Sequence, residues 1–181
     1  MIKGNKVILK LVSEADLGVY HLNLTNLSNR GEYYPIFLQS EAMFRKQYFE
    51  TGFWGEDAGR FLILDLDEKI VGAITFFKAV AAIYSNALEL GYILFDTESR
   101  GKGYATEALK LMVDYLFSLK MMNRIQLRIT AENTASIKVA LKCKFQFDGV
   151  RKEFAYQNGK HIDLNEYFIL RKDWEKEQCA P

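Results

Sequence analysis

A loop with two glycines lies directly before the longest amphipathic segment of the chain. Residues 100–106 read Arg-Gly-Lys-Gly-Tyr-Ala-Thr. Because glycine lacks a Cβ, Gly101 and Gly103 let successive backbone N–H groups converge on one point. The N-terminus of a following helix adds unpaired amides and a partial positive charge. These features predict a binding site for a diphosphate.

Two common nucleotide-binding motifs do not fit this loop. The P-loop pattern Gly-x-x-x-x-Gly-Lys-Ser/Thr is disfavoured because Tyr104 follows Gly103. The dinucleotide pattern Gly-x-Gly-x-x-Gly fits poorly because residue 106 is threonine. A glycine-rich helix start that binds no ligand is the remaining structural alternative.

The elements that must hold this loop follow from hydrophobic periodicity. Apolar residues recur at helical spacing over residues 103–119, and Asn158-Gly159 is a strong hairpin-turn signal. We predict strands at residues 6–12, 61–66, 70–78, 87–95, 124–130, 145–156 and 161–170. Helices are predicted from Ser13 onward with a break at 26–35, and at 40–50, 103–119 and 134–142. This order indicates a mixed α/β fold.

Composition limits the class of protein. The 181 residues are 49% hydrophobic and 26% charged, which excludes a disordered chain and suits one domain, 1–181, with a polar tail at 173–181. The net charge of +1 gives no general attraction to nucleic acid or to a membrane surface. We expect a cytoplasmic protein, since no apolar stretch is long enough for a membrane helix. Cysteine and histidine residues lack metal-site spacing, so we expect no metal.

Two motifs together resemble a known family. Arg100-x-x-Gly103-x-Ala105 resembles the acyl-CoA motif of the GNAT N-acetyltransferase superfamily, and Asn133-x-x-Ser136 resembles that family's conserved asparagine and the helix after it. Glu89-Leu-Gly-Tyr and the full sequence of residues 100–108 are similar to the Rim-type branch, which includes ribosomal-protein N-terminal acetyltransferases.

The resemblance implies a fold and a cofactor. The fold would be a GNAT-like mixed, mostly antiparallel sheet of about seven strands, with helices on both faces and a splayed central strand pair. Acetyl-CoA would be the acetyl donor, with its pantetheine arm along one strand and its diphosphate on the loop. The implied contacts are Ile93, Leu94, Phe95, Arg100, Gly101, Lys102, Gly103, Tyr104, Ala105, Thr106 and Asn133.

Candidate catalytic groups also follow from the resemblance. Glu89 is the only charged side chain in the run 87–93, and the family often places a catalytic carboxylate on this strand, so we expect it to receive the proton of the amine. The alternative is a glutamate that only binds the amine or pairs with a cation. The usual acid, a tyrosine seven residues after the asparagine, is Ala140 here. Ser136 is the substitute, or else a serine of the helix cap.

The resemblance implies an acceptor amine but does not fix its identity. The family forms one wall of its acceptor-binding site in the region that corresponds here to Glu32, Tyr33 and Tyr34. The alternative for these residues is a surface or packing role. We expect an acetyltransferase acting on a protein N-terminal α-amine, by direct transfer in a ternary complex. The alternatives are a small-molecule amine, such as a polyamine or an aminoglycoside-type antibiotic, and a non-catalytic acyl-CoA-binding module. We expect no nucleic-acid or membrane partner, and a monomer or homodimer.

Overall fold

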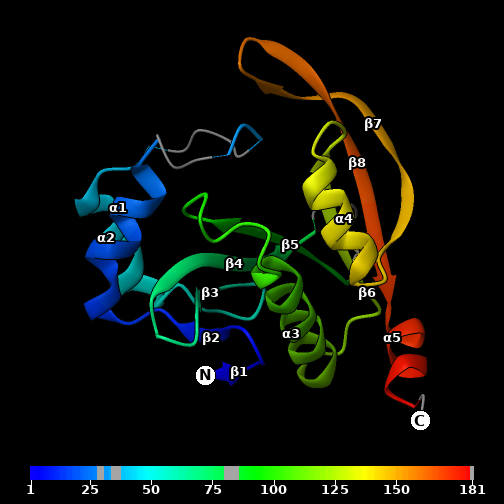
Figure 1. Cartoon of the computed structure of the whole chain (residues 1–181), viewed down its shortest axis with the longest axis horizontal. Helices are drawn as coiled ribbons and strands as arrows, with labels where there is room; N and C mark the ends of the chain where they lie inside the picture. The colour runs from blue at the N-terminus through cyan, green and yellow to red at the C-terminus, as the bar shows by residue number, and fades with distance from the viewer. Residues whose placement is uncertain (28–30, 34–37, 80–85, 180–181) are drawn as a thin grey trace. The chain divides into compact units, whose positions relative to one another are not determined.

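A computed structural model describes residues 1–27, 31–33, 38–79 and 86–179. The chain forms two compact units, Met1–Phe76 with Tyr92–Leu111, and Phe77–Gly91 with Met112–Pro181. Figure 1 labels the helices and strands. The strands are β1 (Ile2–Lys3), β2 (Ile8–Leu11), β3 (Ala58–Leu64), β4 (Ile70–Lys78), β5 (Ala87–Leu94), β6 (Arg124–Thr130), β7 (Gln146–Gln157) and β8 (Lys160–Leu170). The helices are η1 (Glu14–Asp16), α1 (Leu17–Thr25), α2 (Glu41–Thr51), α3 (Tyr104–Leu119), α4 (Thr134–Lys142) and α5 (Arg171–Gln178).

The described strands form one sheet in the order β1-β2-β3-β4-β5-β6-β8-β7. β5 pairs with β6 in parallel, whereas β1/β2, β2/β3, β6/β8 and β7/β8 pair antiparallel. The mixed, mostly antiparallel sheet is confirmed, with eight strands and not about seven. The additional strand is β1, whose two residues pair with Leu9 and Ile8. A strand of two residues is too short to show a period in the sequence.

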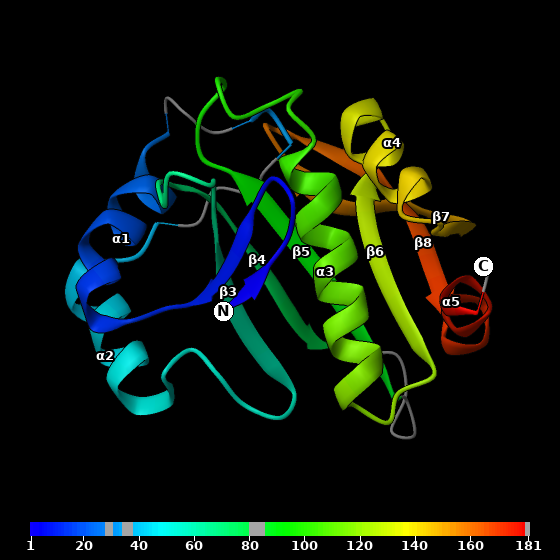
Figure 2. The same cartoon turned by 60° about the horizontal axis from the view of Figure 1, so that its bottom comes forward.

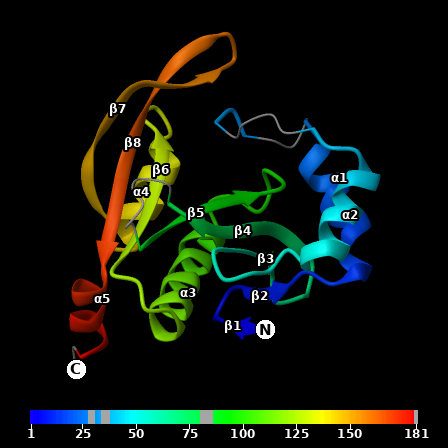
Figure 3. The same ribbon diagram turned by 180° about the vertical axis from the view of Figure 1, so that it is seen from behind.

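The core of the first unit lies between its two helices and the sheet. Aromatic residues Tyr20 of α1, Phe44 of α2 and Phe53 meet at ring distances of 4.9 to 6.4 Å, and α1 and α2 lie side by side in Figure 3. Strand residues of this cluster, such as Leu62, alternate with residues that point to the opposite face, such as Ile63, which is also fully buried. Both faces of this part of the sheet are therefore shielded from solvent.

The second unit contains the long hairpin of β7 and β8, which Figure 1 shows as a curved ribbon. Asn158 and Gly159 have φ angles of 51° and 81°, so the predicted tight turn is confirmed. Helix α4 lies next to β6, as Figure 2 shows, and α5 follows directly after β8.

None of the described helices combines the length and the hydropathy that a membrane span requires.

Candidate active site

The glycine loop belongs to the first unit and has the backbone that its sequence predicts. Gly101 and Gly103 have φ angles of 75° and 88°, in the left-handed region that other residues rarely adopt. Helix α3 begins at the next residue, Tyr104. The first helical amides therefore follow two glycines in left-handed conformation, as an anion-binding loop requires.

The start of the loop is ordered by a carboxylate. Asp96 Oδ1 accepts a hydrogen bond of 2.6 Å from the backbone N–H of Ser99, which is itself buried. Asp96 also pairs with Lys69 at 3.5 Å. Burial alone would raise the pKa of Asp96, but the hydrogen bonds from Ser99 and the charge of Lys69 outweigh it and lower the pKa. Asp96 is thus an ionised anchor for the loop.

Glu107, in the first turn of α3, fixes the loop's far end. Its backbone N–H donates to the carbonyl of Gly103 at 3.0 Å. Its carboxylate accepts hydrogen bonds of 3.0, 2.6 and 2.8 Å from the N–H groups of Asn5, Lys6 and Val7. The turn between β1 and β2 is therefore bound to the beginning of α3.

The backbone of β5 offers less to a pantetheine arm than expected. The amide of Phe95 donates to Val71 O of β4 at 2.9 Å, and Ile93 O lies 2.3 Å from where a Cβ of Gly72 would stand. Because backbone groups alternate sides along a strand, Ile93 and Phe95 face β4 and Leu94 faces the opposite side. Of the three residues expected to pair with pantetheine, only Leu94 presents its backbone away from β4.

The ladder between β5 and β6 ends before either strand does. Registered pairs run from Ala87↔Arg124 to Leu90↔Leu127, while β5 continues to Leu94 and β6 to Thr130. The registered pairing of β5 with β6 therefore covers only the first half of β5, and the expected splay of a central strand pair stays a prediction.

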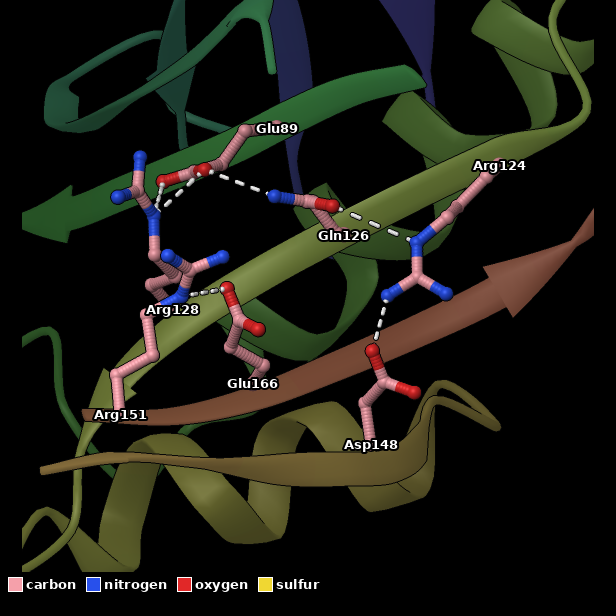
Figure 4. A network of polar contacts seen from close by, with 7 residues as sticks. All are labelled: Glu89, Arg124, Gln126, Arg128, Asp148, Arg151 and Glu166. Carbon is pink, nitrogen blue, oxygen red and sulfur yellow. Dashed lines mark hydrogen bonds and ion pairs between the residues drawn. The ribbon is translucent and has the colours of Figure 1, made fainter. Parts of the chain in front are cut away.

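Glu89, in the second unit, has a cationic partner. Its side chain is almost fully buried, and its two oxygens accept from Arg128 Nε at 2.8 and 2.7 Å. Gln126 Nε2 donates to the same carboxylate at 3.2 Å, and Figure 4 shows the network continuing to Arg124 and Asp148. The geometry corresponds to the alternative interpretation, a glutamate paired with a cation.

Asn133 and Ser136 meet at the N-terminus of α4. Asn133 is the N-cap, and its Oδ1 accepts from the backbone N–H of Ser136 at 3.0 Å. The side-chain amide nitrogen of Asn133 is the end that could donate to a ligand. Ala140 is fully buried, and its methyl side chain cannot act as an acid.

The acceptor-wall residues are described only in part. Glu32 and Tyr33 lie in a turn, Glu32 exposed and Tyr33 half-buried, and Tyr34 lies outside the described residues. Of the predicted site, the glycine loop, the end of β5 and this turn fall in the first unit. Glu89, Asn133 and Ser136 fall in the second.

No three His, Cys, Asp or Glu side chains gather in metal-site fashion within the described ranges.

A family model for the GNAT acetyltransferase domain matches residues 6–146. This range covers most of the chain and includes both the glycine loop and Asn133. The chain belongs to the GNAT acetyltransferase family. The finer assignment to the Rim-type branch has weaker support: a ribosomal-protein-serine acetyltransferase of Escherichia coli is 28% identical over 74% of each chain.

Other relatives match this chain at a higher identity or over a larger share of its length. The p20 protein of Bacillus licheniformis is 34% identical, but the match covers only 48% of each chain. The first curated relatives are matched over 48% to 60% of their own length. Spermidine N(1)-acetyltransferase of Vibrio cholerae is 23% identical over 94% of this chain and 96% of the relative.

Solved structures show the same fold. The Vibrio cholerae spermidine acetyltransferase in complex with CoA and spermine has a TM-score of 0.82 at 20% identity, covering 95% of this chain and 99% of that one. Another structure of that GNAT enzyme, in an intermediate state, is dodecameric, with a TM-score of 0.79 at 20% identity over 96% and 99% of the two chains.

Two residues of the site could not be found from the sequence. The sequence does not indicate Arg128, because its contact with Glu89 depends on the pairing of β5 with β6. Lys6 lies 96 residues before Lys102, whose carbonyl its ammonium contacts at 3.1 Å. The only available signal for Arg128 is its alternation with buried Leu127 and Ile129, which places it on the other face of β6.

Proposed function

We propose that this GNAT protein transfers the acetyl group of acetyl-CoA to a primary amine of a small polyamine of the spermidine type. The acceptor class is supported by the match to the Vibrio cholerae spermidine enzyme, which extends over nearly the full length of both chains. The ribosomal-protein relative is matched over a smaller share. Polyamine acetylation therefore has better support than the protein N-terminal acceptor that the sequence alone favoured.

The glycine loop would bind the diphosphate of acetyl-CoA. The amides of Gly101 to Thr106 would supply hydrogen-bond donors, and α3 would supply the positive end of its dipole. Leu94 would offer its backbone to the pantetheine arm, and the side-chain nitrogen of Asn133 would donate to it. The contacts of Asn133 Oδ1 with the Ser136 amide support this orientation.

Transfer would proceed directly between the two substrates. The amine nitrogen attacks the thioester carbonyl, the new C–N bond forms, the C–S bond breaks, and one amine proton must leave. The departing CoA sulfur gains a proton, for which the Ser136 hydroxyl is our candidate donor. The ion pair with Arg128 supports a positioning role for Glu89 in place of direct proton transfer. The amine would then lose its proton to water, and water would return a proton to the Ser136 oxygen, so that the net proton moves from the amine to the CoA sulfur.

An acceptor panel tests this function. We expect CoA thiol release from acetyl-CoA with spermidine and spermine, at a kcat/KM at least about tenfold above that for a free amino acid or a peptide with N-terminal serine. A higher kcat/KM for the peptide would indicate that the acceptor is a protein N-terminal α-amine and not a polyamine. CoA binding without turnover on any amine would contradict catalysis and favour a binding module.

A further inference from the structure

The two cations of the glycine loop's own sequence lie near other residues of the first unit. Lys102 Nζ lies 5.9 Å from the centre of the Tyr104 ring. Arg100 Nη2 lies 3.6 Å from where a Cβ of Gly31 would stand.

A lysine from the N-terminal turn lies directly beside Gly103. Lys6 Nζ lies 3.2 Å from where a Cβ of Gly103 would be, and it donates to the carbonyl of Lys102 at 3.1 Å. An ammonium group has three N–H donors, so two remain for further acceptors once this carbonyl is bound. The Lys6 residue is exposed, so these donors are accessible to a solute.

The position of Lys6 is fixed through its backbone. Glu107 accepts the N–H of Lys6 at 2.6 Å and those of both neighbours, and Glu107 itself belongs to the first turn of α3. A Cβ on Gly4 would stand 2.6 Å from Glu107 Oε2, so the turn approaches the carboxylate as closely as glycine allows. The same helix turn therefore presents its amides and holds an additional cation beside them.

We propose that Lys6 is a ligand of the acetyl-CoA diphosphate, supplied by the N-terminal turn and held over Gly103 by Glu107. The inference rests on the proposed function, since it requires acetyl-CoA to bind the loop. It assigns a phosphate-binding role to a residue outside both sequence motifs. A lysine ammonium acts on phosphate as a point charge with movable donors, which suits a group reaching the ligand from the side of the loop.

The experiment uses two acetyl donors. Lys6→Met keeps the aliphatic length and removes the charge, and Lys3→Met, in the exposed position of β1, is the matched control. The rates are measured with acetyl-CoA and with S-acetylpantetheine, which lacks the diphosphate and the nucleotide. Equilibrium binding of CoA to each variant is measured by calorimetry.

We expect Lys6→Met to weaken CoA binding and to raise KM for acetyl-CoA by about tenfold, as loss of one charge-assisted hydrogen bond would. The variant should leave kcat/KM with S-acetylpantetheine unchanged, Lys6→Arg should recover most of the affinity, and Lys3→Met should resemble the wild type. Added salt should weaken CoA binding more in the wild type than in Lys6→Met.

Other outcomes overturn the inference. Wild-type CoA affinity in Lys6→Met would remove Lys6 from the diphosphate site. An equal loss with both acetyl donors would show that Lys6 acts on the fold of the loop. Failure of the wild-type protein itself to bind CoA would instead refute the proposed function, and this inference with it.

Discussion

At the scale of single residues, the contacts of Glu89 bear most directly on the chemistry. A general base must reach the proton it accepts, but both oxygens of this carboxylate are bonded to Arg128 and its side chain is almost fully buried. The pair is close enough for each charge to offset the cost of burying the other. Glu89 therefore resembles an orienting partner of Arg128 more than a proton acceptor.

We expect Glu89→Gln to lower kcat by less than about tenfold, because general-base removal typically costs at least about a hundredfold and positioning costs less. Steady-state rates with spermidine provide the measurement, and the pH profile of kcat/KM should keep its shape. A hundredfold loss with an altered profile would establish Glu89 as the base.

Ser136 lies one turn into α4, beside the cap formed by Asn133. If its hydroxyl protonates the leaving sulfur, Ser136→Ala should lower kcat by about tenfold to a hundredfold and leave KM for acetyl-CoA nearly unchanged. Thr134→Ala, at an exposed position in the same helix turn, serves as the control. Wild-type turnover in Ser136→Ala would mean that the serine has only a structural role.

Single positions also show what the sequence can and cannot predict. The left-handed glycines of the loop were predictable because only glycine adopts such φ angles cheaply. Lys144, directly after the end of α4, also has a left-handed φ of 65°, which its residue type does not predict. The side-chain partners of Glu89 and Lys102 were not predictable, because each comes from a strand or turn distant in sequence.

At the scale of elements, the entry to the first helices depends on one buried carboxylate. Asp16 accepts from Lys10 Nζ at 2.8 Å and from the Ser13 N–H at 2.8 Å. Burial alone would raise the pKa of Asp16, but the hydrogen bonds of Lys10 and Ser13 outweigh burial and lower the pKa below its ordinary value of 3.8. The ionised carboxylate therefore stabilises the folded state above that value, and its contribution is lost as pH falls through the lowered pKa.

We expect Asp16→Asn to lower the free energy of unfolding by about 1–2 kcal/mol at pH 7, and by progressively less as the pH falls below about 4. Urea unfolding at a series of pH values measures this. The exposed turn variant Asp67→Asn should be close to wild type throughout. A destabilisation by Asp16→Asn that is equally large at pH 7 and at pH 2.5 would contradict the ionic role.

The end of α3 depends on an arginine from the start of α5. Arg171 donates from Nε to Met122 O at 2.9 Å, from Nη1 to Phe117 O at 2.7 Å, and from Nη2 to Lys120 O. These carbonyls lie at and just beyond the C-terminal turn of α3, where intrahelical donors are lacking. One guanidinium thus closes the helix and ties it to the chain after β8.

Arg171→Met should lower the free energy of unfolding by about 2–3 kcal/mol, because it leaves several half-buried carbonyls without their charged donor. The neighbouring exposed Lys172→Met is the control and should change stability little. Thermal or urea unfolding of both variants is the measurement. Equal stability of the two would show that water replaces the guanidinium without cost.

Element order was largely predictable, and the boundaries were less so. Hydrophobic periodicity predicts the central strands and α3, because apolar residues repeat at regular spacing in these segments. β3 begins at Ala58, three residues before the strand predicted at 61–66. The earlier start was not predictable because Gly59 interrupts the apolar pattern. Gly59 is required by packing: a Cβ there would lie 2.5 Å from the Phe76 ring.

At the scale of the whole molecule, the GNAT fold accounts for the motifs that the sequence displayed. The family match spans residues 6–146, and the structure supplies the left-handed loop, the β5–β6 ladder that ends at Leu90 and the capped α4. Composition excluded broad classes of protein but could not choose an acceptor, because a net charge of +1 carries no preference. The monomer or homodimer expectation stays a prediction, beside a relative that is dodecameric.

The most direct test of the account is a crystal structure of the protein with bound CoA. We predict the diphosphate on the backbone amides of Gly101 to Thr106, the pantetheine arm along β5 at Leu94, and the sulfur beyond the last β5–β6 pair. CoA bound elsewhere, or a loop whose amides make no contact with phosphate oxygens, would contradict the account.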